Sequence, residues 1–302
     1  RGSHARRIVI PEGNVRRGSN VPATIDVLLI SFDRPEYTRL SLGNLLALAD
    51  PDVRVWVWHN GSDPQTLKVV ESFREHPRLH RFHHSPENRK LRDPTNWLWS
   101  EAEGQLLGKV DDDCLVPPDW PARMREAHAA EPRFGALTCW HHQPEDLDER
   151  LYRKKIRTYG GISILQNCWV NGSGYTVKRT AVQEQGSLQE GQSWSDYCID
   201  LALRGWIHGW LYPFLFEDHM DDPRSSHCMI KTDADLARSA PLSAQVNRVT
   251  TIEAWLAQQR RSARLVQKAP LDPRRFRGWR RRFWGPELLR LAQKLMGRRR
   301  SF

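Results

Sequence analysis

Long hydrophobic runs are absent from this sequence of 302 residues. No stretch of about 18 apolar residues occurs, which excludes a membrane-spanning helix. A basic start followed by a short apolar segment is also missing, so we expect no signal peptide. A charged fraction of 27% and a hydrophobic fraction of 39% are typical of a soluble globular protein. Together these features predict a protein of the cytoplasm.

Cysteine is scarce as well. The five cysteines lie singly along the chain, an odd number without any Cys-x-x-Cys spacing. This distribution indicates neither a disulfide framework nor a zinc site, and it suits a reducing compartment.

An excess of positive charge is missing from most of the chain, although the whole sequence carries a net charge of +10. Residues 260–302 hold 15 lysines and arginines and only two acids. The residues before them are slightly acidic, with 31 basic and 34 acidic side chains. A nucleic-acid groove through this larger part would need positive charge there, so the basicity belongs to the C-terminal tail.

Three consecutive acids, Asp111 to Asp113, are the most distinctive feature that is present. They follow the largely apolar residues 106–110, a pattern that predicts a buried strand delivering carboxylates to its C-terminal edge. Alternation along a strand would make Asp111 and Asp113 point the same way. Adjacent carboxylates repel one another unless a cation neutralises them, and oxygen ligands favour Mg²⁺ or Mn²⁺. An Asp-rich turn that only caps the next helix fits this stretch equally well.

Strand and helix patterns alternate along the first half of the chain. Strands are predicted at residues 25–32, 53–58 and 80–84, and helices are predicted from Pro35 through Ala49, from Pro64 with Ser62 or Asp63 as its cap, and from about Asp93. Such repeated units predict a parallel sheet. Its strand ends should bring Ser31, Asn60 and Asp111 to one edge, where nucleotides bind in open α/β sheets.

The order of these motifs resembles that of the inverting glycosyltransferases of GT-A fold, the large family two. The resemblance implies an α/β fold with a Rossmann-like mixed sheet flanked by helices, and a nucleotide-diphosphate sugar, a UDP-sugar, as donor. It implies Mn²⁺ or Mg²⁺ held by Asp111, Asp113 and a late histidine, His219. The residues implied to contact the donor are Ser31, Phe32, Arg34, Asn60, Asp63, Asn88, Arg89, Asp111, Asp112, Gly172 and Arg224. His59 and Asn60 stand where the family usually has two acids.

Two later segments extend the resemblance. Residues 167–177 look like the Gly-rich segment on the acceptor side of the family, although a simple turn between strands fits them as well. Residues 193–205 predict a helix with Ser195 as its N-cap and Asp196 in its first turn. The positive end of a helix favours an ionised carboxylate, which is the state that a general base needs. The resemblance implies that Asp196 is this base; the alternative is that Asp196 only supports the cap.

The apolar run at residues 206–216 predicts a strand before His219, with His227 as the competing metal ligand. Arg224 has two interpretations, a bidentate contact with a diphosphate or a structural pair with Asp221 or Asp222. Trp169 and Trp194 lie beside the motif segments, where stacking on a sugar and packing in the core are both open.

The tail combines arginine with tryptophan and phenylalanine. A helix is predicted from Thr251, an Arg-rich segment covers residues 274–284, and a last helix is predicted from Pro286. This composition fits a segment lying on anionic lipid, helices packed on the body with solvated arginines, or, third, a nucleic-acid-binding tail.

We therefore predict an N-terminal arm (1–24), a GT-A catalytic domain (25–235) and a basic helical extension (236–302). The expected activity is metal-dependent, inverting transfer of a sugar to a hydroxyl of a glycan, a lipid or a protein, in the cytoplasm, with the tail at the inner face of the membrane as a further hypothesis. A metal-dependent phosphohydrolase or nucleotidyltransferase would use Asp111 and Asp113 without needing Asp196. A nucleic-acid-associated or DNA-modifying protein would depend on the tail, and its binding would weaken steeply with salt.

Overall fold

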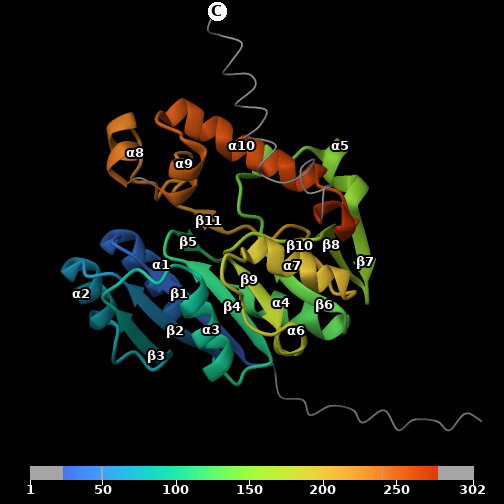
Figure 1. The fold of residues 1–302 in the computed structure, drawn as a ribbon, viewed down its shortest axis with the longest axis horizontal. Coiled ribbons are helices and arrows are strands. Elements are labelled where there is room, and N and C mark those ends of the chain that lie inside the picture. The colour runs from blue at the N-terminus through green and yellow to red at the C-terminus, as the bar shows by residue number, and fades with distance from the viewer. Residues whose placement is uncertain (1–22, 49, 240, 278–302) are drawn as a thin grey trace, which may run out of the picture.

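The computed structural model describes residues 23–277, except residues 49 and 240 (Figure 1). Its first half alternates strands and helices as predicted: β1 (Ile25–Ser31), α1 (Pro35–Ala47), β2 (Val53–Asn60), α2 (Pro64–Ser72), β3 (Leu79–Ser85), α3 (Arg92–Glu101) and β4 (Leu106–Asp111). The second half contains β5 (Cys114–Leu115), α4 (Trp120–Ala130), β6 (Phe134–Thr138), α5 (Glu149–Tyr152), β7 (Ile156–Tyr159), β8 (Ile162–Asn167), β9 (Tyr175–Lys178), α6 (Arg179–Gln185), α7 (Trp194–Leu203), β10 (Ile207–Tyr212), β11 (Asp218–His219), α8 (Asp233–Ser239), α9 (Leu242–Asn247) and α10 (Ile252–Lys268). Short 3-10 turns lie at η1 (Pro144–Asp146), η2 (Arg153–Lys155) and η3 (Pro273–Phe276).

The main sheet has the strand order β3-β2-β1-β4-β9-β6-β10-β8-β7. Strands β1 to β4 run parallel, whereas β9 lies antiparallel between β4 and β6. This is the mixed α/β sheet of the expected GT-A fold. In its register Ile30 lies beside Asp111, and Ser31 lies beside His59. The carboxyl ends of β1, β2 and β4 therefore meet at one edge, as the sequence predicted.

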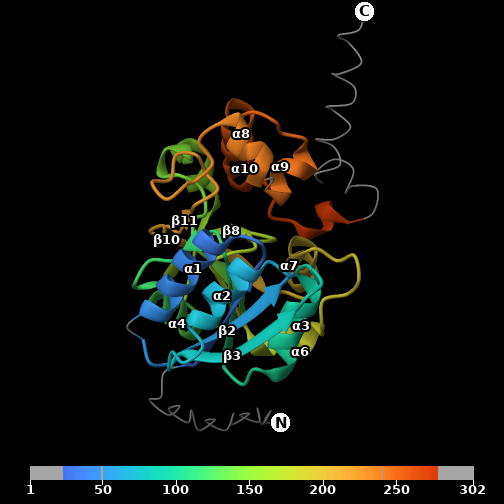
Figure 2. The same ribbon diagram turned by 90° about the vertical axis from the view of Figure 1, so that its left-hand side faces the viewer.

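Helices cover both faces of this sheet, because its central strands carry apolar side chains on both sides. One core is filled from α1, α2 and α4, for example by Leu45, Val70 and Trp120. The opposite core is filled from α3, α6 and α7, with Leu98, Val182 and Trp194. Figure 2 shows these two sets of helices on opposite sides of the sheet. Burial of apolar residues on both faces fixes the strand ends that carry the polar residues.

A second sheet has two strands, β5 and β11, which are far apart in the sequence and pair antiparallel. His219 pairs with Cys114, and Asp218 pairs with Leu115. The backbone N–H of Met220 donates to the carbonyl of Asp113 at 2.7 Å. This pairing brings the residues after β10 directly against the three consecutive acids.

The described part of the C-terminal extension packs on the catalytic domain. Helix α10 begins after Thr251, whose side chain caps it, so the predicted helix start is confirmed. Trp255, Ala263 and Val266 are buried, while the arginines of α10 are exposed. For α10, packing on the body with solvated arginines is therefore the arrangement observed. The predicted helix from Pro286 lies outside the described residues. None of the helices in residues 23–277 combines the length and hydropathy needed to cross a bilayer.

Candidate active site

Three potential metal ligands converge beyond the end of β4. Oδ2 of Asp113 lies 3.8 Å from Nε2 of His219. One ligand atom each from Asp113, His219 and Asp221 falls within 4.8 Å of the others. Asp113 comes from the turn after β4, and the other two come from β11 and the turn that follows it. The structure thus unites two predicted ligands with a third, Asp221, that sequence reasoning missed. We call Asp113, His219 and Asp221 the metal group.

Burial and Arg34 set the charges of this group. Burial opposes ionisation of Asp113, but His219 and the Arg34 guanidinium hold the pKa of its carboxyl below its usual range. Burial, with His141 beside it, lowers the pKa of His219 to about 3, so the imidazole is neutral at pH 7. Burial and repulsion from Asp113 raise the pKa of Asp221 to about 8 despite the pull of Arg34. A neutral imidazole next to a carboxylate is the donor pair that a divalent ion needs.

The residues present fit a divalent ion. Oδ1 of Asp221 is buried and has no hydrogen-bond partner among the described residues, and neither has Nδ1 of His219. A buried carboxylate oxygen without a donor is costly unless a cation or a proton satisfies it. Two carboxylates and one imidazole form a set that suits Mn²⁺ better than Mg²⁺, which prefers oxygen ligands alone.

Asp111 lies apart from this group, in contrast to the predicted set of Asp111, Asp113 and His219. Its carboxylate is bound by Lys109, whose Nζ also donates to the carbonyl of Gly172 at 2.8 Å. Strand alternation explains the pairing, since Lys109 and Asp111 are two residues apart on β4. Strand alternation does not apply to Asp111 and Asp113 as predicted, because β4 ends at Asp111 and Asp113 belongs to the following turn. Asp111 stays a candidate for donor contact rather than a member of the metal group.

Asp112 is turned toward the end of β1. Its Oδ2 accepts a hydrogen bond from the backbone N–H of Phe32 at 3.0 Å. Burial, and repulsion from Asp113, raise the pKa of Asp112 to about 7. Phe32 is 41% exposed at this edge, whereas the hydroxyl of Ser31 is buried and bonded to Nδ1 of His59 at 3.0 Å. Phe32 is therefore an aromatic residue partly open to solvent next to the acids.

The predicted donor residues after β2 and β3 mainly shape the backbone. The amide of Asn60 binds Trp58, the N–H of Arg89 and the carbonyl of Lys90, which ties β2 to the loop before α3. Asp63 caps α2 by accepting from the N–H of Thr66 at 2.7 Å, as predicted. Asn88 accepts from the N–H of Lys90 at 2.8 Å. The side chain of Arg89 is half exposed and pairs with Glu87 at 2.9 Å.

Two alternatives left open by the sequence are decided by contacts. Arg224 forms a structural fork, bound to Asp222 and to Asp146 at 2.7 Å each. Its predicted role at a diphosphate would require one of these contacts to open. His227 lies 2.7 Å from Asp218 and outside the Asp113 group, so His219 is the histidine that the fold places with Asp113.

Asp196 lies in the first turn of α7, as predicted, but Ser193 rather than Ser195 is the N-cap. The hydroxyl of Ser193 accepts from the N–H of Asp196 at 3.1 Å. Arg277, which follows η3, lies 3.4 Å from the Asp196 carboxylate and donates to its backbone carbonyl at 3.0 Å. The same guanidinium binds Asp200 on the next turn. The C-terminal extension therefore reaches the residue implied to be the base.

The start of α7 is joined to the metal side of the site through Trp194 and Asn171. The indole N–H of Trp194 donates to the carbonyl of Asn171 at 3.0 Å, next to Gly172. The Trp194 ring stacks on Tyr175, with 4.1 Å between centroids, and Tyr175 pairs with Lys109 across β9 and β4. Tyr197 also lies parallel to Trp194, with 5.8 Å between centroids, and Trp194 is only 5% exposed. Core packing is thus the arrangement observed for Trp194.

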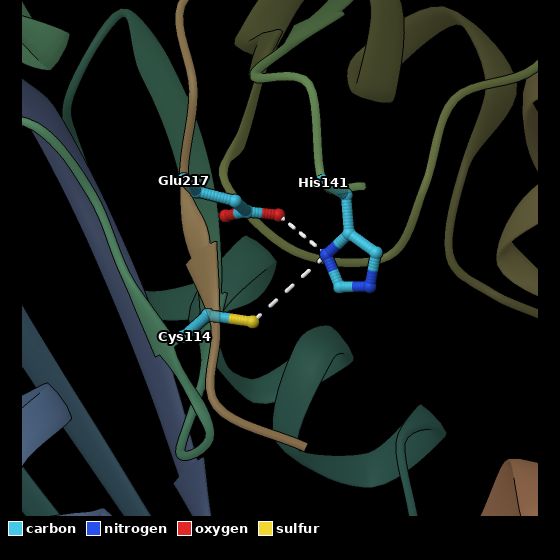
Figure 3. A group of neighbouring side chains, drawn as sticks. All are labelled: Cys114, His141 and Glu217. Carbon is cyan, nitrogen blue, oxygen red and sulfur yellow. Dashed lines mark hydrogen bonds and ion pairs between the residues drawn. The ribbon is translucent and has the colours of Figure 1, made fainter. Parts of the chain in front are cut away.

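A second set of chemically reactive side chains was missed entirely by sequence reasoning. Cys114, His141 and Glu217 lie against one another beside the metal group (Figure 3). No local spacing could reveal them, because they come from β5, from the loop after β6 and from the segment before β11.

Comparisons with known proteins identify the family and the fold of this chain. Residues 26–189, more than half of the chain, match the model of a family described as glycosyl transferase family 2. The mannosyltransferase PcManGT from Pyrobaculum calidifontis, in complex with GDP-Man and Mn²⁺, is 18% identical with a TM-score of 0.57, over 92% of this chain and 81% of that one. Residues 1–349 of S. aureus TarS with UDP-GlcNAc are 14% identical with a TM-score of 0.50, over 89% and 81%.

GalNAc-T7 with UDP, GalNAc and Mn²⁺ is 13% identical with a TM-score of 0.53, over 67% of this chain and 44% of that one. At such identities these structures share the fold with the chain, which is the GT-A fold. The family match over more than half of its length shows that this chain belongs to glycosyl transferase family 2.

Proposed function

We propose that this glycosyltransferase uses a nucleotide-diphosphate sugar as donor and depends on a divalent metal ion. The observation that carries the proposal is the convergence of Asp113, His219 and Asp221 at the carboxyl end of β4 in a family 2 chain. The neighbours with GDP-Man and Mn²⁺, and with UDP-GlcNAc, support both parts.

Asp113, His219 and Asp221 would hold Mn²⁺ in preference to Mg²⁺, since one donor is an imidazole nitrogen. The ion would supply positive charge to offset the charge that develops on a diphosphate leaving group. The chain adds a cation of its own, because Arg34 binds Asp113 at 3.0 Å and Asp221 at 2.8 Å. A guanidinium in this position can exchange a carboxylate for a diphosphate oxygen without leaving the site.

We place the nucleoside over the ends of β1 and β2, where open α/β sheets bind nucleotides. Phe32 is exposed there and can stack on a base, while Asp112 fixes the backbone of Phe32. UDP is our first choice of nucleotide, from the family resemblance.

Asp196 is proposed as the base that removes the proton of an acceptor hydroxyl during direct, inverting displacement. The carboxylate is held at the start of α7 by Ser193 and Arg277, which fix its orientation. Trp194 donates to the carbonyl of Asn171, and the neighbouring Gly172 accepts from Lys109 of β4, which supports a position of this helix start on the β4 side of the site. The acceptor is a hydroxyl of a glycan, a lipid or a protein.

Calorimetry with UDP-, GDP- and dTDP-sugars, with and without Mn²⁺, tests the donor. We expect at least one of them to bind, and to bind more tightly with Mn²⁺. The anomeric configuration of the product, read by NMR, then tests inversion. Absence of binding for all three, or binding that ignores Mn²⁺, would refute the proposal.

Attachment of the Arg-rich tail to anionic lipid at the inner face of the membrane remains a hypothesis. Sedimentation with neutral and anionic vesicles, using the whole chain and a chain ended at residue 277, tests it. We expect binding only by the whole chain and only to anionic vesicles.

A further inference from the structure

Cys114, His141 and Glu217 form a compact cluster next to the metal group, with their polar ends directed at one another (Figure 3). Sγ of Cys114 lies 4.0 Å from Nδ1 of His141, and Oε1 of Glu217 lies 2.8 Å from the same nitrogen. One donor atom from each residue falls within 4.8 Å of the other two. Three donors this close can contact one ion after side-chain shifts of about an ångström, given zinc bonds of about 2.0–2.3 Å.

The cluster is held in place by the fold. Cys114 and Glu217 are buried, and Glu217 also contacts Ser173 and Asn171, each at 3.3 Å. Gly174 has a positive φ of 60°, and a Cβ there would collide with the Glu217 carboxylate. The absence of a side chain at Gly174 thus leaves space for the buried Glu217 carboxylate. Asn171 and Ser173, both neutral donors, orient it, as outer-shell partners do for metal ligands.

We propose that Cys114, His141 and Glu217 form a second metal site, one that takes Zn²⁺ or a similarly thiophilic ion. Thiolate sulfur, imidazole nitrogen and carboxylate oxygen are each zinc ligands, and three of them leave one coordination position of a tetrahedral ion open. A hard ion such as Mg²⁺ would not select a thiolate. Zinc would displace the proton shared by His141 and Glu217 and the proton of the Cys114 thiol, and both protons would pass to solvent.

Asp113, a ligand of the proposed Mn²⁺ site, also contacts the zinc cluster. Its Oδ1 lies 3.4 Å from Sγ of Cys114, while its Oδ2 faces His219 at 3.8 Å. The rings of His141 and His219 also lie against each other, with 4.1 Å between centroids. An ion bound by Cys114 would attract the carboxylate of Asp113. It would also add positive charge next to an ion bound by the metal group, which would repel that ion. If the proposed function holds, Zn²⁺ will therefore weaken binding of Mn²⁺ and of the donor, and the effect will be reciprocal.

Cobalt titration of the whole chain tests the site without any donor or activity. Co²⁺ bound to a thiolate gives a sulfur-to-metal charge-transfer band in the near ultraviolet, which oxygen and nitrogen ligands do not give. We expect this band in the unaltered protein, its loss in Cys114→Ser, and its displacement by Zn²⁺. Cys198→Ala is the matched control, because Cys198 is a buried cysteine on α7 outside the cluster.

Glu217→Gln keeps the thiol and should weaken Co²⁺ roughly 10- to 100-fold, which covers the case in which Cys114→Ser does not fold. Asp221→Asn should weaken Mn²⁺ and leave the cobalt band in place, so the two sites are tested separately. A protein without the band, or a band that persists in Cys114→Ser, would overturn the zinc site and leave the proposed function untouched. His141 and Glu217 would then be an ion pair that orients His219.

Discussion

The guanidinium of Arg34 lies 3.0 Å from the carboxylate of Asp113, and it is only 20% exposed. Its second nitrogen reaches Asp221 at 2.8 Å. One cationic side chain thus bridges the two carboxylates that, with His219, form the proposed Mn²⁺ site. In the protein without metal, this guanidinium supplies the positive charge that keeps two buried acids side by side.

Replacing Arg34 by alanine should therefore destabilise the metal-free protein. We expect a loss of about 2–3 kcal/mol in the free energy of unfolding, since a nearly buried ion pair is broken and two acids are left facing each other. Mn²⁺ should restore more stability to this variant than to the unaltered protein. Thermal unfolding with and without Mn²⁺ measures both effects, with Arg39→Ala as the exposed control. Equal gains from Mn²⁺ in both proteins would contradict this interpretation.

Asp113→Asn and Asp111→Asn should behave differently. Asp113 belongs to the metal group, so its variant should weaken Mn²⁺ at least about 10-fold. Asp111 is bound by Lys109, so its variant should change Mn²⁺ binding little and weaken the donor instead. Calorimetric titration with Mn²⁺ alone, and then with donor, separates the two. The same loss of Mn²⁺ in both variants would show that Asp111 moves into the metal group.

The late histidines provide a second matched pair. His219→Ala removes an imidazole that faces Asp113, and we expect Mn²⁺ affinity to fall roughly 10- to 100-fold. His227→Ala removes a half-exposed imidazole paired with Asp218, and we expect no change. Paramagnetic quantification of free Mn²⁺ measures both. Loss of affinity in His227→Ala alone would reverse the assignment.

Asp196→Asn should lower kcat by roughly 10²- to 10⁴-fold and leave the affinity for donor unchanged, because a general base acts only in the chemical step. Asp200→Asn is the matched control, since Asp200 lies one turn along α7 and shares Arg277. Initial rates and donor titrations measure the split between kcat and binding. A rate that survives in Asp196→Asn would favour a metal-dependent hydrolase or nucleotidyltransferase.

Two buried histidines should make the fold sensitive to mild acid. Burial lowers the pKa of His208 to about 4 and that of His128 to about 3, from the ordinary value of 6.5. The unfolded chain then binds protons that the folded chain refuses, so stability is full above pH 6.5 and falls as the pH drops toward 4. The loss should reach about 3 kcal/mol for His208.

His208→Asn tests this, because an amide oxygen can accept from the N–H of Ala136 as Nδ1 of His208 does, at 2.8 Å, without titrating. Urea unfolding between pH 7 and pH 4.5 should show a flatter profile for this variant. Replacement of the partly exposed His76 by asparagine should leave the profile as it is. An equally steep profile in His208→Asn would assign the acid sensitivity to other groups.

Local patterns predicted the first half of the fold well, because alternation, caps and strand ends are properties of neighbouring residues. Asp63 at its cap and His219 beside Asp113 follow from such patterns and from motif order. Asp221 was not predictable, since its place depends on how β11 pairs with β5 more than a hundred residues earlier. The different placement of Asp111 and Asp113 has a local cause, because β4 ends at Asp111, two residues sooner than the alternation argument assumed.

The indole of Trp255, on α10, donates a hydrogen bond to the backbone carbonyl of Asp221 at 2.8 Å. A shortened recombinant chain that stops at residue 235 would retain all three proposed Mn²⁺ ligands and yet lose the support behind one of them. Inactivity of such a fragment would therefore say nothing about the chemistry of the enzyme. A comparison restricted to residues 26–189, the part that matches the family model, would likewise leave out this hydrogen bond.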